Sequence, residues 1–278
     1  MSDGTTATAG GAMAARPDGA AAGAANPIRR GPVIVLTYAH SGAMNLMQAL
    51  STSRSLACTA GTGLLPLCDT AAATWQRVEN RGAPASPLAL QSIRTLVATM
   101  TAVIQAGAGA SRWCETAFVA PAAAETFLRI FPDTAFLCLH RSLRGVLAEA
   151  AAAYPWGLGG SPFWPYSAAH PGNNAETIGS YWAACAGQLL DFEASHPSSC
   201  LRVRYEDILA DPHRRVDDIL AHLGVSTRDP MAPGGLPGLP GLTGQPDPGP
   251  EPPLPTERMS PELLTQLREL HARLDYAP

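Results

Sequence analysis

The sequence predicts an α/β protein in which helices flank a parallel sheet, built as a single domain. One observation is a continuous, largely β-branched run, PVIVLTYA at 32–39, which is typical of a strand buried on both faces. Another is that strand-like and helix-like segments alternate along the chain, which favours a sheet with right-handed crossovers. With 278 residues, 46% of them hydrophobic, the chain is long enough for one substantial core.

The first strand–helix unit combines the run at 32–39 with the segment SGAMNLMQALS, where Leu46, Met47 and Leu50 recur at helical spacing. The second unit spans 122–153. It contains a helix, a turn at Pro132-Asp133, a strand AFLCLH and a further helix from about Ser142.

The third unit spans 178–225 and begins with a long helix that carries Ile178, Trp182, Leu189 and Phe192. A turn at His196-Pro197 leads to the strand CLRVRY. A last helix opens at Asp211-Pro212 and ends near Gly224, since proline at the first turn and glycine past the end are the usual signals.

The chain outside these units divides by composition. Residues 1–27 are rich in Ala and Gly and predict a disordered tail, because they cannot bury enough apolar surface to offset the entropy of ordering. The α/β domain then covers 28–229, and the Pro/Gly-dense stretch 230–256 predicts an extended linker. An amphipathic helix in 257–278, with Ser260 as N-cap, is expected to dock on the core.

The segment 154–174, YPWGLGGSPFWPYSAAHPGNN, is too rich in Gly, Pro and aromatic residues for regular structure. It suits a lid over a small-molecule acceptor, and an ordinary packed surface loop explains it equally well.

Charge and cysteine usage exclude several classes of protein. A net charge of -4 gives no basic stripe for nucleic acid, and no apolar run is expected to reach the length of a membrane span, so a cytoplasmic protein without nucleic-acid or membrane partners is expected. The six cysteines lack metal-ligand spacing, so neither a metal site nor a disulfide framework is expected. The oligomeric state cannot be predicted.

The stretch TYAHSGAMN at 37–45 joins the first strand to the first helix. Such a loop aims backbone N–H groups at one point, and the helix N-terminus adds partial positive charge, so an anion is stabilised there. The G-x-x-x-x-G-K-[ST] spacing of nucleoside triphosphatases is absent.

Three segments together resemble the sulfotransferase family, whose members use 3'-phosphoadenosine-5'-phosphosulfate as sulfuryl donor. TYAHSGAMN resembles the family's 5'-phosphosulfate loop, T-Y-P-K-S-G-T-T-W. FPDTAFLCLHRSLRGVLAEA resembles the strand and helix that bind the 3'-phosphate, and RYEDILADP is similar to the family's (R/K)-Y-E-D-L-x-x-D-P. The resemblance covers about residues 32–225 and implies the P-loop-like sulfotransferase fold.

The resemblance also implies roles for individual residues. Ser41, Gly42 and the neighbouring amides would hold the 5'-phosphate, Arg141 would meet the 3'-phosphate, and Tyr205 would lie near the adenine. The preferred interpretation of the acids Glu206 and Asp207 is structural, namely that they end a strand and begin a helix.

Several positions of the family's donor-binding pattern are altered in this chain. His40 stands where the family has lysine or arginine, Ala43 and Met44 replace two threonines, Asn45 replaces an aromatic residue, and Glu149 replaces a serine. A histidine is cationic only part of the time near neutral pH. A carboxylate repels a phosphate, so Glu149 would instead pair with the arginine two helical turns earlier.

The segment RWCETAF supplies a candidate catalytic group. It matches only the tryptophan and the acid of a W-G-(E/D)-K-(S/T)-P segment of bacterial members, so Glu115 is the candidate general base for an acceptor hydroxyl, alongside His40 as the other candidate catalytic residue. A buried acid bonded to backbone explains Glu115 equally well.

Three hypotheses follow. The leading one is a divergent sulfotransferase that transfers a sulfuryl group to a hydroxyl of a small acceptor in bacterial secondary metabolism. In the second, the fold has lost the sulfate donor and performs other tailoring chemistry with His40, His140, Arg141 and Glu115 gathered at the strand ends. The third is a non-catalytic pseudo-enzyme.

Overall fold

The computed structural model describes residues 31–79, 85–225 and 253–276. The predicted tail 1–27 lies outside the described residues, as does most of the predicted linker 230–256.

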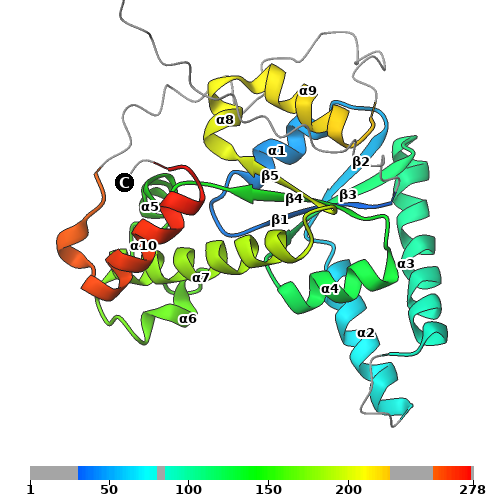
Figure 1. The fold of residues 1–278 in the computed structure, drawn as a ribbon, viewed down its shortest axis with the longest axis horizontal. Coiled ribbons are helices and arrows are strands. Elements are labelled where there is room, and N and C mark those ends of the chain that lie inside the picture. The colour runs from blue at the N-terminus through cyan, green and yellow to red at the C-terminus, as the bar shows by residue number, and fades with distance from the viewer. Residues whose placement is uncertain (1–30, 80–84, 226–252, 277–278) are drawn as a thin grey trace, which may run out of the picture.

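The fold is built on one parallel sheet of five strands in the order β2-β3-β1-β4-β5 (Figure 1). The strands are β1 (Val33–Thr37), β2 (Leu56–Ala60), β3 (Arg112–Phe118), β4 (Ala135–His140) and β5 (Cys200–Arg204). Every pairing between neighbouring strands is parallel. The predicted fold class, a parallel sheet flanked by helices, is confirmed.

The central strands explain why both faces of the sheet are covered. All five residues of β1 are buried, and so are all six of β4. Because successive side chains of a strand point to opposite faces, Val33 and Val35 enter one core and Ile34 and Leu36 enter the other. The continuous apolar run of the sequence is therefore the signature of a strand with a core on each side.

Two groups of helices form the two outer layers (Figure 1). The smaller group supplies Leu46, Met47 and Ile219 to the core of Val33 and Val35. It consists of α1 (Ala43–Leu50), α8 (Tyr205–Ala210) and α9 (Pro212–His222).

The larger group covers the opposite face and contributes, among others, the fully buried Phe127 and Trp182. It consists of α2 (Leu64–Val78), α3 (Pro87–Ala108), α4 (Pro121–Ile130), α5 (Leu143–Ala153), α6 (Trp164–Ser167), α7 (Asn174–Ser195) and α10 (Pro261–Arg273). A short 3-10 helix, Thr256–Arg258, precedes α10.

The structure differs from the sequence-based expectation at three places. The strand predicted to end at Tyr205 ends one residue earlier, because Tyr205 already begins α8. The segment 154–174, expected to lack regular structure, contains the helical turn α6, with proline in its first turn. Strands β2 and β3 and helices α2 and α3 were not predicted at all.

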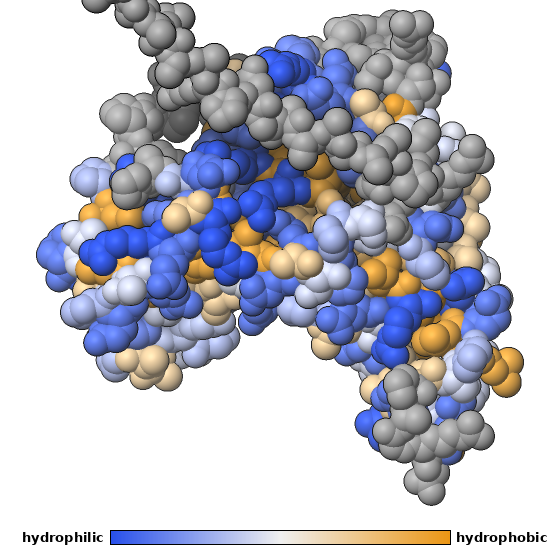
Figure 2. All heavy atoms as spheres, viewed as in Figure 1, coloured by the Kyte–Doolittle hydropathy of each residue, from blue (hydrophilic) through white to orange (hydrophobic). Residues whose placement is uncertain are grey.

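Helix α3 also corrects an expectation about membranes. By length and composition alone, its 22 residues are apolar enough to cross a bilayer, so the expectation that no apolar run reaches that length is wrong. Core helices of soluble proteins pass the same test. Here Ile93 and Val97 are buried in the core, while Leu88 and Leu96 are exposed. Figure 2 shows apolar residues interspersed with polar ones on the side of the molecule where α3 lies.

Helix α10 returns to the body of the molecule and packs on α7. Leu263, Leu267 and Leu270 are buried in the same core as Trp182, and the His271 ring meets the Trp182 ring edge-on at 5.2 Å. The last described residues thus belong to the main core.

Candidate functional site

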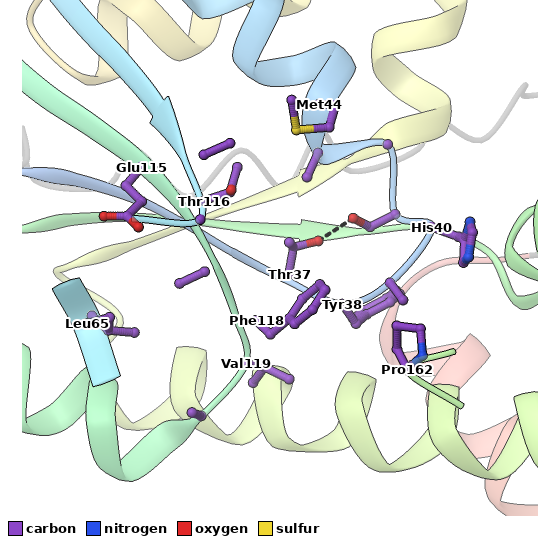
Figure 3. Close-up of a pocket in the computed structure, with 18 of the residues that line it drawn as sticks. Thr37, Tyr38, His40, Met44, Leu65, Glu115, Thr116, Phe118, Val119 and Pro162 are labelled. Atoms are coloured by element: carbon purple, nitrogen blue, oxygen red, sulfur yellow. Dashed lines mark hydrogen bonds between the residues drawn. The ribbon is translucent and has the colours of Figure 1, made fainter. Parts of the chain in front are cut away.

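A cavity of about 860 Å³ lies at the carboxyl ends of β1 and β3, where open parallel sheets bind their ligands (Figure 3). The loop between β1 and α1 forms one wall, and the loops that follow β2 and β3 form others. The 154–174 segment contributes Tyr154 and Pro162.

The β1–α1 loop has a backbone shape suited to anions. His40 and Gly42 both adopt left-handed conformations, with φ of 60° and 85°, so the chain turns sharply before α1 begins at Ala43. Gly42 is the N-cap of α1 and provides no side-chain cap. The first N–H groups of a helix have no intrahelical partner, so those of Ala43 and Met44 remain for a ligand in the cavity.

Hydrogen bonds to three other elements hold this loop in place. The Tyr181 hydroxyl of α7 accepts from the Ala39 amide at 2.9 Å. Thr37 Oγ1 donates to Ser41 Oγ (dashed in Figure 3) and lies 3.3 Å from the Leu139 carbonyl. The Tyr38 hydroxyl exchanges two 2.9 Å bonds with the backbone that follows β4. The loop is therefore preorganised rather than free.

Glu149 of α5 contacts the side chains of both His40 and Arg141 beside the cavity. One carboxylate oxygen lies 3.2 Å from Nδ1 of His40, and the other accepts from Nη1 of Arg141. Burial opposes ionisation of Glu149, but the hydrogen bond to His40 and the charge of Arg141 outweigh it and lower its pKa. Glu149 thus places a carboxylate in the lining of the cavity, next to the anion loop.

Aromatic side chains of the 154–174 segment fix the His40 ring. It stacks on Phe163 with centroids 5.6 Å apart and meets Tyr154 edge-on at 5.5 Å. The 154–174 segment therefore contacts the anion loop directly and lies beside the cavity.

Glu115 lies at the other end of the cavity from His40 (Figure 3). Its side chain is only 2% exposed, and it accepts hydrogen bonds from Thr62 Oγ1 at 2.5 Å and from the Gly63 amide at 3.2 Å. Burial raises its pKa, although these hydrogen bonds offset part of the effect. Glu115 therefore both braces the loop after β2 and presents a weakly acidic carboxyl group to the cavity.

An apolar wall faces the anion loop and was missed by sequence reasoning. It consists of Leu65, Pro66, Phe118, Val119 and Ala123. Phe118 is 60% exposed although it is large and apolar. The sequence signal that could have located this wall is the end of β3 at Phe118, but β3 was not predicted from the sequence.

Of the predicted site residues, eight line this cavity. They are His40, Ser41, Gly42, Ala43, Met44, Asn45, Glu115 and Glu149. Arg141 and Tyr205 do not line it. The Arg141 guanidinium donates to the His40 carbonyl at 2.8 Å and lies over the Tyr205 ring at 4.7 Å, and Tyr205 is only 2% exposed. Both support the loop from beneath.

His140 departs from the expectation that it joins the other polar groups at the site. It is fully buried, and its Nε2 lies 2.6 Å from Glu193 Oε1 in α7. Glu193 also accepts from Arg202 Nε at 2.7 Å. His140 and Glu193 therefore form a buried pair between β4 and α7, away from the cavity.

The acids after β5 act structurally, as preferred from the sequence. Glu206 accepts from the Ser142 amide at 2.8 Å, and Asp207 pairs with Arg215 at 3.1 Å. Within the described ranges, no group of three or more His, Cys, Asp or Glu residues could hold a metal ion, and all six cysteines are unpaired.

A parallel sheet whose first strand leads through a tight loop to a helix N-terminus beside a cavity defines a P-loop-like α/β protein. The model of the sulfotransferase family matches residues 32–229, and the chain belongs to that family.

Solved sulfotransferase structures share this fold at low sequence identity. The sulfotransferase domain from the curacin biosynthetic pathway is 16% identical with a TM-score of 0.56, over 89% of this chain and 98% of that domain. A sulfotransferase from Alicyclobacillus acidocaldarius is 15% identical with a TM-score of 0.50, over 90% and 97%. One from Mycobacterium avium is 12% identical with a TM-score of 0.53, over 90% and 78%. A search of curated proteins found no significant match.

Proposed function

We propose that this chain is a transferase that moves a sulfuryl group from a nucleoside 5'-phosphosulfate to a hydroxyl group of a small acceptor. The family's donor, 3'-phosphoadenosine-5'-phosphosulfate, is the reference candidate. The observation that carries the proposal is the cavity in which the open N-terminus of α1 faces an apolar wall, in a chain of this family.

The residues around the cavity divide the task. Backbone amides at Ala43 and Met44 would hold the phosphosulfate oxygens, and the helix dipole would stabilise the charge that gathers on the leaving phosphate. His40, held by Phe163 and Glu149, lies beside this position as a hydrogen-bonding group.

The acceptor would lie on the apolar wall formed by Phe118, Val119 and Leu65. In the reaction, the acceptor oxygen bonds to sulfur while the bond from sulfur to the phosphate oxygen breaks. The acceptor proton passes to a base, and Glu115 is the candidate because it is the carboxyl group at that end of the cavity (Figure 3). An apolar wall with one such polar group fits a small natural product bearing a hydroxyl group.

A second candidate function is favoured by Glu149. Since this carboxylate already engages both His40 and Arg141, the site is compatible with an enzyme that has lost the sulfate donor and performs other tailoring chemistry on an acceptor in the same cavity.

Nucleotide binding at the α1 N-terminus separates these candidates. We would titrate adenosine 5'-phosphate and 3'-phosphoadenosine-5'-phosphate calorimetrically into the wild type, Met44→Asp and Met44→Asn. Met44 is 63% exposed, and an acid in the first turn of a helix stabilises it, so lost binding in Met44→Asp cannot come from unfolding.

We expect at least one nucleotide to bind the wild type with micromolar affinity. That affinity should fall about tenfold or more in Met44→Asp, and it should be unchanged in Met44→Asn, whose side chain has the shape of aspartate without the charge. No binding of either nucleotide at millimolar concentration would overturn it in favour of the second candidate.

A further inference from the structure

The charge around the cavity restricts which nucleotide it can hold. Apart from tyrosines, the ionisable side chains that line it are His40, Glu115 and Glu149, so the lining carries two carboxyl groups and no arginine. Arg141 lies just outside, and Glu149 already takes up its charge. A ligand with several negative charges therefore meets a lining that has two carboxyl groups, beside an arginine that is already paired.

Glu149 itself is open to a ligand. Its side chain is 46% exposed, whereas those of its partners His40 and Arg141 are 13% and 14% exposed. Each carboxylate oxygen makes one of these contacts, and an ionised carboxylate offers about four acceptor positions, so about two remain for donors from a ligand. The lowered pKa keeps the group ionised near neutral pH, when it can only accept hydrogen bonds.

The chemistry that suits such a carboxylate beside an anion loop is a ribose hydroxyl. Acidic side chains hydrogen-bond ribose hydroxyls in dinucleotide-binding folds, and they exclude a phosphate at the same position. A phosphate monoester would bring about -1.5 to -2 charges at pH 7 against Glu149.

We propose that Glu149 selects a donor nucleotide whose ribose is not phosphorylated, that is, an adenosine 5'-phosphosulfate with a free 3'-hydroxyl, and discriminates against 3'-phosphorylated nucleotides. This proposal rests on the proposed function. The α1 N-terminus holds the single anionic end of the nucleotide, and Glu149 accepts hydrogen bonds from its ribose. The step is then adenosine 5'-phosphosulfate plus acceptor alcohol giving adenosine 5'-phosphate, the sulfate ester and a proton taken up by the base.

The test compares two nucleotides on four proteins. Adenosine 5'-phosphate and 3'-phosphoadenosine-5'-phosphate are titrated calorimetrically into the wild type, Glu149→Gln, Glu149→Ser and Glu125→Gln. Glu125 is an exposed acid on α4, so its replacement changes the net charge equally without touching the cavity. Thermal melts establish that each variant is folded.

We expect the wild type to bind adenosine 5'-phosphate at least about tenfold more tightly than the 3'-phosphorylated nucleotide. Both Glu149 variants should tighten the 3'-phosphorylated nucleotide by about tenfold or more and reverse or abolish the preference, while Glu125→Gln leaves it unchanged.

The outcomes separate this proposal from the proposed function. Tighter binding of the 3'-phosphorylated nucleotide to the wild type, insensitive to Glu149, would overturn the selection by Glu149 and leave the sulfuryl transferase standing. Absence of binding of either nucleotide to all four proteins would overturn the transferase itself.

Discussion

Gly42 lies directly against the ring of Tyr205, so closely that a Cβ atom at Gly42 would overlap the ring carbons. The Tyr205 hydroxyl also accepts from Asn45 Nδ2 at 2.6 Å. The anion loop thus packs on the Tyr205 ring. The resemblance to the family had implied a different role for Tyr205, a position near the adenine. The shape of the loop depends on this contact between the start of α1 and the start of α8.

Gly42→Ala should destabilise the protein and disrupt the loop. An alanine at this position is strained by the left-handed backbone, and its methyl group would overlap the Tyr205 ring. The free energy of unfolding should therefore fall by about 3 kcal/mol. Gly172→Ala is the matched control, because Gly172 also has a left-handed φ of 73° but open space at its Cβ, and should cost about 1 kcal/mol. Equal losses in chemical denaturation would contradict the role of Tyr205.

Glu115→Gln should lower kcat about 100-fold or more with little change in KM, if the carboxylate is the general base. The wild-type rate should rise with pH as Glu115 loses its proton, through a pKa raised by burial, and this limb should vanish in the variant. A pH profile that is the same in both proteins would assign Glu115 to bracing the Thr62 loop alone.

The raised pKa of Glu115 also predicts a dependence of stability on pH. The folded state holds the proton more tightly than the unfolded state, so this contribution is complete below the ordinary pKa of glutamate, about 4.3, and is lost as the pH rises through the folded value. Urea denaturation across this range should show the loss in the wild type and not in Glu115→Gln.

Glu193→Ala should destabilise the fold without altering the site. Glu193 is the partner of the fully buried His140 and of Arg202, and removing one member of a buried pair typically costs about 3 kcal/mol or more. Nucleotide affinity should be unchanged, because His140 faces away from the cavity. A selective loss of nucleotide affinity with stability intact would place His140 in the site after all.

Tyr181→Phe should loosen the anion loop. It removes the acceptor of the Ala39 amide, and a buried N–H left without a partner costs about 1–3 kcal/mol. Faster hydrogen exchange at residues 38–42 should accompany the loss. Tyr166→Phe, which removes a hydroxyl from the ring packed against Tyr181, is the control and should leave the exchange of the loop unchanged.

The parts of the fold that could be predicted from the sequence are those with local signals. β1 and β4 are unbroken apolar runs, and α9 carries its own start signal in Asp211-Pro212, where Asp211 indeed caps the helix. Such features need no knowledge of distant residues. The segments resembling family motifs are of this kind, and the match over residues 32–229 bears out the family.

The missed strand β3 shows why the rest could not be predicted. It carries Arg112 and Glu115, both buried, and charged residues interrupt the apolar run that would mark a buried strand. The Arg112 guanidinium donates from Nε to the Gly31 carbonyl at 3.0 Å and from Nη1 to the Leu223 carbonyl at 2.5 Å, and the Glu115 carboxylate accepts from the loop after β2. Buried charges become acceptable only through partners that the sequence does not reveal.

His140 illustrates the same limit within the candidate site. A histidine beside an arginine at a strand end suggests a ligand contact, and only the position of Glu193 on α7 assigns it to the core. Whether a polar residue at a strand end faces the cavity or a neighbouring helix depends on the packing of that helix, which local sequence does not encode.

The docking of α10 has a practical consequence for where the folding unit ends. The family match stops at residue 229, yet Tyr276 donates a 2.9 Å hydrogen bond to Glu206, the same side chain that accepts from the amide at the start of α5. A chain shortened to residues 32–229 would expose Trp182 and its apolar neighbours on α7 to solvent. Truncation boundaries for expression are therefore better taken from the packing of Leu263 to Tyr276 than from the extent of recognisable homology.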